Sequence, residues 1–399
     1  MPGSDETCDV VVIGGGLVGM SLCYELVARG LKVLLADLRH QGRATDAGAG
    51  ILSPETFLDP DDDWARFASK AGEHHRELTS RVGEDGAKGT GHETCGLIKL
   101  ANQPGEDEFI ATAAALAARR HPETVREIDS REAHKAFPPL GEVRRAIYNP
   151  AAARIDGRRA TEAIGLAASS RGLRTSRCEV LSLELSDGRA VGVDTTSGRI
   201  SAGAVAIAGG AWSSRFASQL DVRLPVVPLK GQIAHMKLPD SATGGWPIIQ
   251  PVLSHYLVPW PEGRVAVGGT LEPDAGFDTT PTAAGLYELL REGLRTAPGL
   301  GRATVEELRV GLRPASADGR PILGALPGWP NVHVATGHGT EGLLLGPYSS
   351  ALVAEGIASG TVARAITAYS PARFTAEPEP CADPAGRASG SARSGAPSV

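Results

Sequence analysis

Residues 9–37, DVVVIGGGLVGMSLCYELVARGLKVLLAD, constrain the fold of this chain more than any other segment. The β-branched run at residues 10–13 is typical of a parallel strand that is buried on both faces. Gly14, Gly16 and Gly19 follow in the pattern G-x-G-x-x-G, ahead of an amphipathic run and a second apolar run. The segment therefore predicts a strand, a tight turn, a helix and a second strand.

Each glycine of this turn has a role in binding a dinucleotide. The first allows the turn, the second lets the backbone approach a pyrophosphate, and the third lets the helix pack closely on the sheet. The helix N-terminus favours a phosphate without any basic side chain. Asp37 ends the second strand about 20 residues further on, where a carboxylate binds ribose hydroxyls. We predict dinucleotide binding; the alternative is a tight turn in another α/β protein, with Asp37 at a solvated strand end.

Length and composition narrow the class of protein. At 399 residues the chain is expected to form two domains. A net charge of −6 without a basic cluster argues against nucleic acid as a partner. Because the N-terminus is polar and the sequence has no long apolar run, we expect no signal peptide and no membrane span. The five scattered cysteines favour a reducing cytoplasm over a disulfide framework or a metal site.

The rest of the chain alternates between two patterns. Residues 151–219 and 304–369 continue the α/β pattern, whereas residues 56–150 and 220–303 carry no dinucleotide signature and contain predicted antiparallel strands. Helices are expected over residues 64–82 and 106–120, with His74 and His75 at the surface. Residues 370–399 are rich in Pro, Ala, Gly, Ser and Arg, which predicts a disordered tail.

We therefore predict an α/β protein, α+β overall, with two domains. A Rossmann-like dinucleotide-binding domain would comprise residues 7–55, 151–219 and 304–369. A mainly antiparallel-sheet substrate domain would be inserted into it, from residues 56–150 and 220–303. The small-residue segment 43–51 could follow the pyrophosphate and offer amides to a ring, or it could be a flexible loop.

Two further features point to a ligand site. A second strand, glycine turn and helix occur at residues 333–335, 337–342 and from 343 onward, so a second helix dipole is available for an electron-rich group. Arg313 lies in an apolar segment, where an unpaired guanidinium is unfavourable, so it should meet an internal carboxylate or that of a ligand. Of His255 and Tyr256, adjacent on one strand, only one can face a pocket; a Tyr256 packed within the sheet is the alternative.

These residues together resemble the glycine oxidase and D-amino acid oxidase family of FAD-dependent oxidoreductases. The resemblance extends from Cys8 to about Gly356 and is carried by segments in the family's order. They are GGGLVG with Asp37, GRATDAGAGILSP, AGGAWS, PLKGQI, HYLVP, VGGT, GLRP with DGRPILG, and GHGTEGLLLGP.

The resemblance implies an extended, non-covalently bound FAD. Non-covalent binding is expected because no cysteine lies within residues 313–324, where one branch of the family attaches flavin. The pyrophosphate would lie at the first glycine turn, the ribose at Asp37, the adenine side at Val180, and the flavin near residues 49–51 and the second glycine turn. The implied cofactor contacts are Gly14, Gly16, Leu17, Val18, Gly19, Asp37, Leu38, Ala44, Thr45, Ala49, Gly50, Ile51, Val180, Gly209, His338, Gly339, Thr340, Glu341, Gly342, Leu343 and Leu344.

The resemblance also implies the chemistry. Arg313 would bind the carboxylate of a small amino acid or secondary amine, Tyr256 would face the substrate, Thr270 would be a pocket residue, and Thr340 would help to orient the substrate. Hydride transfer from the Cα–H to flavin N5 would give an imine that hydrolyses, and O2 would be reduced to H2O2. Thr340 replaces an arginine that is usual in glycine oxidases, so the charge of the pocket differs.

Several alternatives stay open at this stage. The strand RVAVGGT lacks a lysine that one branch uses with oxygen, so an amino acid dehydrogenase with another electron acceptor is the main alternative. A nucleotide-binding protein without redox turnover is a second. A NAD-dependent dehydrogenase is disfavoured because it has no use for the second glycine turn. The residue pattern does not determine the preferred amine or its enantiomer. It is compatible with a monomer and with a homo-oligomer.

Overall fold

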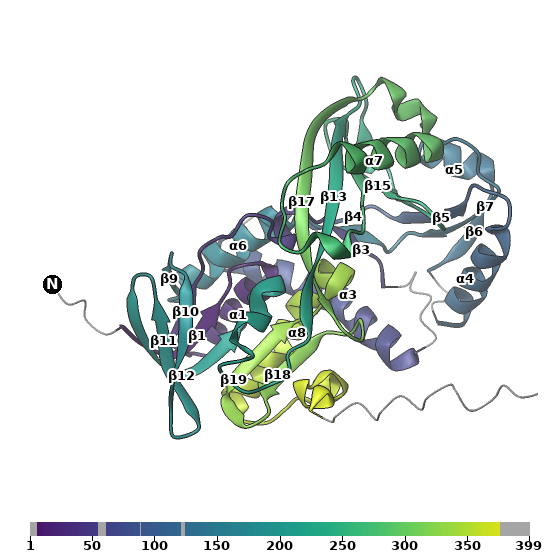
Figure 1. The fold of residues 1–399 in the computed structure, drawn as a ribbon. Coiled ribbons are helices and arrows are strands. Elements are labelled where there is room, and N and C mark those ends of the chain that lie inside the picture. Colours follow the sequence, from purple (N-terminus) through teal and green to yellow (C-terminus); the bar gives the residue numbers. More distant parts are fainter. Residues whose placement is uncertain (1–5, 55–60, 88, 121–123, 376–399) are drawn as a thin grey trace, which may run out of the picture.

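The computed structural model describes residues 6–54, 61–87, 89–120 and 124–375. Two eight-stranded sheets and a small third sheet form the fold, with helices packed on both large sheets (Figure 1). The predicted α/β fold with a Rossmann-like unit and a second sheet is confirmed. Residues 370–375, expected to belong to the tail, include the short helix η8 (Pro371–Phe374), which an ion pair of 2.7 Å between Arg373 and Asp318 holds in place. The remainder of that tail, residues 376–399, lies outside the described residues.

The first sheet carries the glycine-rich turn. Its strands β9, β2, β1, β12 and β19 are parallel, and β10, β11 and β18 add antiparallel pairs. Val10 and Val12 of β1 pack on one face while Val11 and Ile13 pack on the other, as the β-branched run predicts. The strands are β1 (Glu6–Ile13), β2 (Val33–Ala36), β9 (Arg174–Ser176), β10 (Val180–Ser186), β11 (Arg189–Thr195), β12 (Gly198–Ile207), β18 (Ile322–Leu326) and β19 (Trp329–Thr336).

Four helices cover one face of the first sheet and share a single apolar cluster with β1. They are α1 (Leu17–Ala28), α3 (Asp62–Glu84), α6 (Gly157–Ser170) and α8 (Gly342–Ser359). The expected surface position of two histidines on α3 is wrong: His74 is 9% exposed and His75 is 1% exposed. The reason is that α3 packs along α8, so its buried face is wider than its apolar residues alone indicate.

The second sheet has the strand order β17-β13-β16-β15-β14-β5-β7-β6. One face is covered by α5 (Ser130–Ala136) and α7 (Ala283–Thr296), while α4 (Asp107–Arg120) packs against β5 and β7. Residues from 304 onward were expected in the dinucleotide unit, but β17 pairs with β13 along its length. The strands are β5 (Leu97–Ala101), β6 (Arg126–Ile128), β7 (Arg145–Asn149), β13 (Val226–Lys237), β14 (Ile248–Pro251), β15 (Tyr256–Pro259), β16 (Arg264–Gly268) and β17 (Thr304–Ser316).

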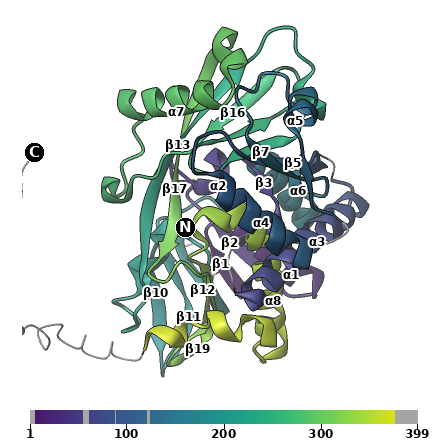
Figure 2. The same cartoon turned by 90° about the vertical axis from the view of Figure 1, so that its right-hand side faces the viewer.

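The two large sheets are joined by long strands and short connections. Figures 1 and 2 show β13 and β17 running side by side from the second sheet toward the first. The helix α2 (Ala44–Ala47) and the 3-10 helix η2 (Gly210–Phe216) both contact β17. A small sheet of β3 (Ile51–Leu52), β4 (Glu93–Thr94) and β8 (Ala153–Arg154) lies beside them. The remaining 3-10 helices are η3 (Thr243–Gly245), η4 (Pro273–Ala275), η5 (Pro298–Arg302), η6 (Gly339–Glu341) and η7 (Arg364–Tyr369).

Three whole-chain features bear on function. Across the described ranges, no cluster of three or more His, Cys, Asp or Glu side chains could hold a metal ion. Within those same ranges, no helix combines the length and apolar character needed to cross a bilayer. Among the cysteines that the structure describes, Cys8, Cys23, Cys95 and Cys178, no two form a disulfide.

Candidate active site

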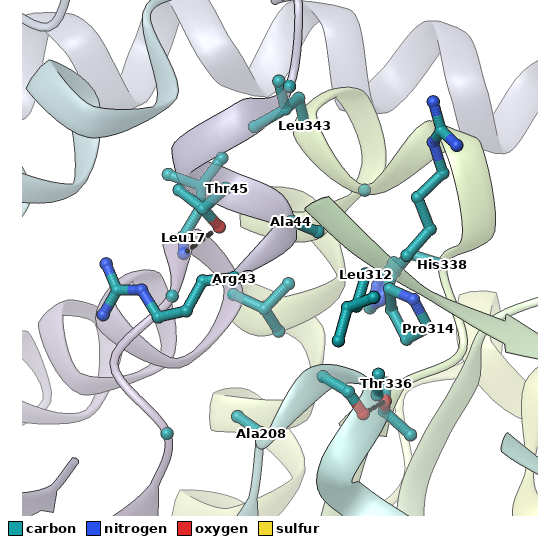
Figure 3. A pocket seen from close by; sticks show the side chains of 18 of the residues that line it. Leu17, Arg43, Ala44, Thr45, Ala208, Leu312, Pro314, Thr336, His338 and Leu343 are labelled. Atoms are coloured by element: carbon teal, nitrogen blue, oxygen red, sulfur yellow. Dashed lines mark hydrogen bonds between the residues drawn. The ribbon is translucent and has the colours of Figure 1, made fainter. Parts of the chain in front are cut away.

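A cavity of about 540 Å³ lies between the two large sheets, a size typical of ligand pockets. Residues from both sheets line it, and Figure 3 shows Leu17 and Thr45 on one side with Pro314 and His338 on another. Almost every residue predicted from the sequence to form the site lines this cavity. These residues are Gly14, Gly16, Leu17, Val18, Asp37, Leu38, Ala44, Thr45, Ala49, Gly50, Ile51, Val180, Gly209, Tyr256, Arg313, His338, Gly339, Thr340, Glu341, Gly342, Leu343 and Leu344.

The glycines bring β1 and α1 into close contact at one end of the cavity. Gly14 has a φ of +101°, and a Cβ at this position would lie 2.6 Å from the carbonyl oxygen of Ala208. A Cβ at Gly19 would lie 1.9 Å from the carbonyl oxygen of Gly14. Gly19 is therefore absent from the cavity lining, since its role is to let α1 pack on the turn.

The N-terminus of α1 faces the cavity, and among the described residues no charged side chain hydrogen-bonds its first-turn amides. Gly16 is the N-cap residue, so there is no capping side chain, and the first turn contains no acidic residue. The amide of Leu17 donates to Oγ1 of Thr45 at 3.0 Å, which fixes α2 against α1 (Figure 3). The positive end of the helix dipole is thus available for an anion such as a pyrophosphate.

Asp37 lies beside this turn and is held by Arg43, which the sequence analysis did not single out. Nη1 of Arg43 donates to Asp37 at 3.0 Å and to the carbonyl of Gly15 at 3.2 Å. The guanidinium also donates to Asp46, and Arg43 is 9% exposed. A partly buried ion pair therefore orients the carboxylate that is predicted to bind ribose.

The second glycine turn brings a buried histidine to the cavity. His338 is 4% exposed, and both of its ring nitrogens lack a hydrogen-bond partner within the described part of the chain. Burial lowers the pKa of His338 to about 4, so the ring is neutral at pH 7. The helix α8 begins beside it without a capping side chain. Buried polar groups rarely lack partners, so this end of the cavity is suited to a ligand with hydrogen-bonding edges.

These features test whether the residues fit an FAD. A glycine cradle with an uncapped helix suits a pyrophosphate, and Asp37 is placed for a ribose. A buried histidine with free ring nitrogens and a second uncapped helix suit the polar edge of a flavin. The donor set therefore fits FAD.

Arg313 enters the cavity from β17 of the second sheet. Its Nη1 donates to the carbonyl of Thr270 at 3.0 Å, and its charge acts on the phenol of Tyr256, where it opposes the rise in pKa that burial causes. A Cβ at Gly231 would lie 2.0 Å from Nη1, so the bare glycine on β13 makes room for the side chain. Within the described residues, no carboxylate lies within 4.0 Å of Arg313, so it has no internal ion pair.

The structure distinguishes the two candidates at the start of β15, His255 just before the strand and Tyr256 at its first position. Tyr256 lines the cavity, and burial raises its pKa although Arg313 opposes the shift. His255 instead bonds Glu288 of α7 at 3.0 Å, on the other side of the sheet. Thr270 is not among the lining residues, because its Oγ1 accepts from the amide of Gln232 at 2.9 Å and donates to Glu272 at 2.5 Å.

Lys99 is a lining residue that the sequence analysis missed. It lies on β5 and is 8% exposed, and its Nζ donates to Oε1 of Gln250 at 3.1 Å. The ammonium also lies over the ring of Phe109, 5.7 Å from the centroid. Burial lowers the pKa of Lys99 to about 8. The sequence feature that could have identified Lys99 is its position as the one charged residue inside the apolar run LIKLA.

Comparison with known proteins agrees with this geometry. A family model described as FAD dependent oxidoreductase matches residues 9–356. The glycine oxidase of Pseudomonas aeruginosa is 33% identical, over 87% of this chain and 93% of its own length. The crystal structure of iminodiacetate oxidase from Chelativorans sp. BNC1 has a TM-score of 0.86 at 37% identity and covers 91% of this chain and 98% of that one. Glycine oxidase from Geobacillus kaustophilus has a TM-score of 0.84 at 26% identity and covers 94% of this chain and 100% of its own.

Proposed function

Because this chain belongs to the family of FAD-dependent oxidoreductases, we propose that it oxidises the C–N bond of a small amino acid or secondary amine that carries a carboxylate. The observation that carries this proposal is Arg313, a guanidinium that reaches the cavity without an ion-pair partner among the described residues. Arg313 is only partly exposed, and a partly desolvated guanidinium without an ion pair is unfavourable, so a ligand carboxylate is the natural partner. The names of the relatives, glycine oxidase and iminodiacetate oxidase, support the same class of substrate.

We place the cofactor along the cavity from the first sheet to the second. Gly14, Leu17 and Val18 would hold the pyrophosphate of FAD, and Asp37 would hold the adenosine ribose. Residues 49–51 and the start of α8 would hold the flavin, with His338 as a hydrogen-bond partner. When bound, FAD supplies the acceptor for a hydride from the substrate carbon. The absence of cysteine from residues 313–324 supports non-covalent binding.

The side chains of the second sheet would orient the substrate. The planar guanidinium of Arg313 matches a carboxylate with two parallel hydrogen bonds. The carbonyl of Thr270 and the phenol of Tyr256 restrict its rotation, so the bound carboxylate has a defined position. This orientation would direct the Cα–H toward the flavin, and the substrate would react as the neutral amine once its ammonium has lost a proton to water.

The proposed overall reaction consumes the amine, O2 and water. It yields a carbonyl acid, the released amine and H2O2, after hydrolysis of an imine. Reduction of a different electron acceptor would make the protein a dehydrogenase of the same fold. In both cases the second sheet would serve as the substrate domain and the first as the FAD-binding domain.

The first experiment measures anaerobic bleaching of the bound flavin by glycine, sarcosine, iminodiacetate, proline and both enantiomers of common amino acids. Bleaching by one of these, followed by rapid H2O2 release in air, supports an oxidase. Bleaching with slow recovery in air supports a dehydrogenase. A protein that takes up no FAD, or whose flavin none of these amines reduces, contradicts the proposal.

A variant of Arg313 tests its role in the same assay. Replacing Arg313 by Met should lower kcat/KM for carboxylate substrates about 100-fold or more while the protein retains its flavin. The matched control is Arg302→Met, an exposed arginine at the end of η5 that is not among the lining residues. Unchanged kinetics for Arg313→Met would remove Arg313 from the substrate site.

The cellular location and the assembly state stay predictions. The scattered cysteines favour the cytoplasm, which cell fractionation tests. A homo-oligomer is tested by light scattering of the purified holoprotein.

A further inference from the structure

The cations that line the cavity differ in their ion pairing between the side of the first sheet and the side of the second sheet. On the side of the first sheet, each cation has a carboxylate partner: Arg43 pairs with Asp37 at 3.0 Å and Arg215 pairs with Glu179 at 2.9 Å. On the side of the second sheet, Arg313 and Lys99 have no carboxylate within 4.0 Å among the described residues. The excess positive charge is therefore confined to the half of the cavity that would receive the substrate.

Lys99 faces this half because of the alternation along its strand. Ile98 and Leu100 pack into the cluster beneath α5 and α7, whereas Leu97 packs into the cluster on the opposite face with Ile248. Lys99 shares the face of Leu97 and lies next to Gln250 on the neighbouring strand β14. Tyr256, Gln250 and Lys99 thus form a row across adjacent strands that begins beside Arg313.

One carboxylate acts on both cations. Glu341, in η6, interacts electrostatically with Arg313 and with Lys99, so all three groups belong to one region of the cavity. Two cations and one carboxylate leave this region positively charged when all three are ionised. A substrate with a single carboxylate would satisfy Arg313 and leave Lys99 bonded to the neutral amide of Gln250.

We infer that Lys99 binds a second carboxylate, so that the preferred substrate is an amino or imino dicarboxylate with one carboxylate on Arg313 and the other on Lys99. This inference rests on the proposed amine oxidation and specifies its substrate class. A buried ammonium with no anionic partner of its own is otherwise unfavourable. The hydrogen bond to Gln250 and the contact with Phe109 hold it in place in the absence of substrate.

Binding of unreactive acids tests the inference without turnover. Perturbation of the flavin spectrum of the holoenzyme gives dissociation constants for succinate against butyrate, and for malonate against propionate. We expect the diacid to bind about tenfold or more tightly than the monoacid of equal length in at least one pair. Equal affinity of the diacid and the monoacid in both pairs would overturn the inference, whatever the amine specificity.

Kinetics of a variant provide the second test. Replacing Lys99 by Met should raise KM for a dicarboxylate such as iminodiacetate or glutamate about 30-fold or more, and leave KM for glycine and sarcosine within about threefold. Lys99→Arg should restore part of the loss. Equal losses for both classes of substrate, or a loss confined to the reaction with O2, would assign Lys99 another role and overturn the inference.

The outcomes separate this inference from the proposed function. Oxidation of glycine or sarcosine with no advantage for dicarboxylates in wild-type enzyme keeps the proposed function and contradicts the role of Lys99. Failure of every amine to reduce the flavin contradicts the proposed function itself. If diacids nevertheless bind more tightly than monoacids, and Lys99→Met removes the difference, the second anion site stands independently of the chemistry.

Discussion

At the scale of single residues, the burial of Lys99 is unfavourable for the folded protein in the absence of ligand. Its pKa falls from 10.5 to about 8 because the ammonium is desolvated. A shift of this size corresponds to a loss of stability on the order of 3 kcal/mol at neutral pH. Groups of this kind are retained where function needs a charge in a dry site.

Replacement of Lys99 by Met should therefore stabilise the flavin-free protein at pH 7, by up to about 3 kcal/mol. Between pH 8 and 10.5 the unfolded chain binds the proton that the folded chain has released, so wild-type stability rises with pH in this window. The advantage of Lys99→Met should shrink there and vanish above pH 10.5. Denaturant unfolding at pH 7 and pH 10 measures both effects. Lys135→Met, at an exposed position of α5, is the control, and an equal gain from that variant would contradict the explanation.

Gly231 offers a second prediction at the residue scale, because it determines where Arg313 can lie. In Gly231→Ala the new methyl group would overlap the guanidinium, which would have to move away from the carbonyl of Thr270. We expect KM for carboxylate substrates to rise about tenfold or more while FAD binding is unchanged. Gly301→Ala, where a Cβ meets no atom within 4 Å, is the matched control. A Gly231→Ala enzyme with wild-type KM would show that Arg313 needs no exact placement.

At the scale of elements, α1 and its turn depend on one close approach. In Gly19→Ala the Cβ would collide with the backbone of Gly14, which no side-chain rotation relieves. We expect destabilisation of about 3 kcal/mol or more, together with loss of FAD binding. Gly83→Ala, an exposed helical position in α3 with open space, should instead stabilise by about 1 kcal/mol. Thermal unfolding measures the stability of both variants. If Gly19→Ala and Gly83→Ala destabilise the protein equally, the close packing at Gly19 is not the cause.

The contact between α3 and α8 explains why His75 is buried. Pro347 lies inside α8 and has no N–H, so the carbonyl of Leu343 loses its helical partner four residues on. Nε2 of His75 lies 2.8 Å from that carbonyl and 3.0 Å from the carbonyl of Leu344. Burial lowers the pKa of His75 to about 4, so the ring is neutral and its single proton is required on Nε2. The histidine thus replaces the donor that the proline lacks.

A double-mutant cycle tests this replacement. His75→Leu should destabilise the protein by about 1–3 kcal/mol, because the carbonyl of Leu343 loses its donor. In a Pro347→Ala background the helix supplies its own N–H, so the same change should be at least about 1 kcal/mol less harmful. Denaturant unfolding of the four proteins measures the coupling. Strict additivity would show that the histidine contributes only by packing.

At the scale of the whole molecule, the cavity is built from both sheets, so a ligand of the length of FAD would connect them. Saturation with FAD should raise stability by about 2.7 kcal/mol at 100 times its dissociation constant. Hydrogen exchange should slow in α1 and β2 and also in β15 and β17. ADP, which lacks the flavin, should protect α1 and β2 alone. Equal protection of the second sheet by ADP would contradict an FAD that extends from one sheet to the other.

The local part of the site follows directly from the sequence. The strand β1, the turn and α1 are contiguous, and the glycines and Asp37 have roles set by backbone geometry within that short segment. The order of the later motifs was likewise sufficient to select Tyr256, Arg313 and the second glycine turn, all of which line the cavity. These predictions needed no knowledge of which strands pair.

Other features were decided by tertiary structure alone. Lys99 hydrogen-bonds Gln250, which lies on a strand far away in the chain. His75 hydrogen-bonds a carbonyl that a proline in α8 leaves without its helical donor. The place of β17 in the second sheet is set by its pairing with β13. Strand pairing and helix packing determine which face of an element is buried and which side chains meet across it, and such contacts join residues that share no local pattern. For this reason the sequence by itself determined the cofactor turn, while the distribution of charge in the substrate half of the cavity emerged from the folded chain.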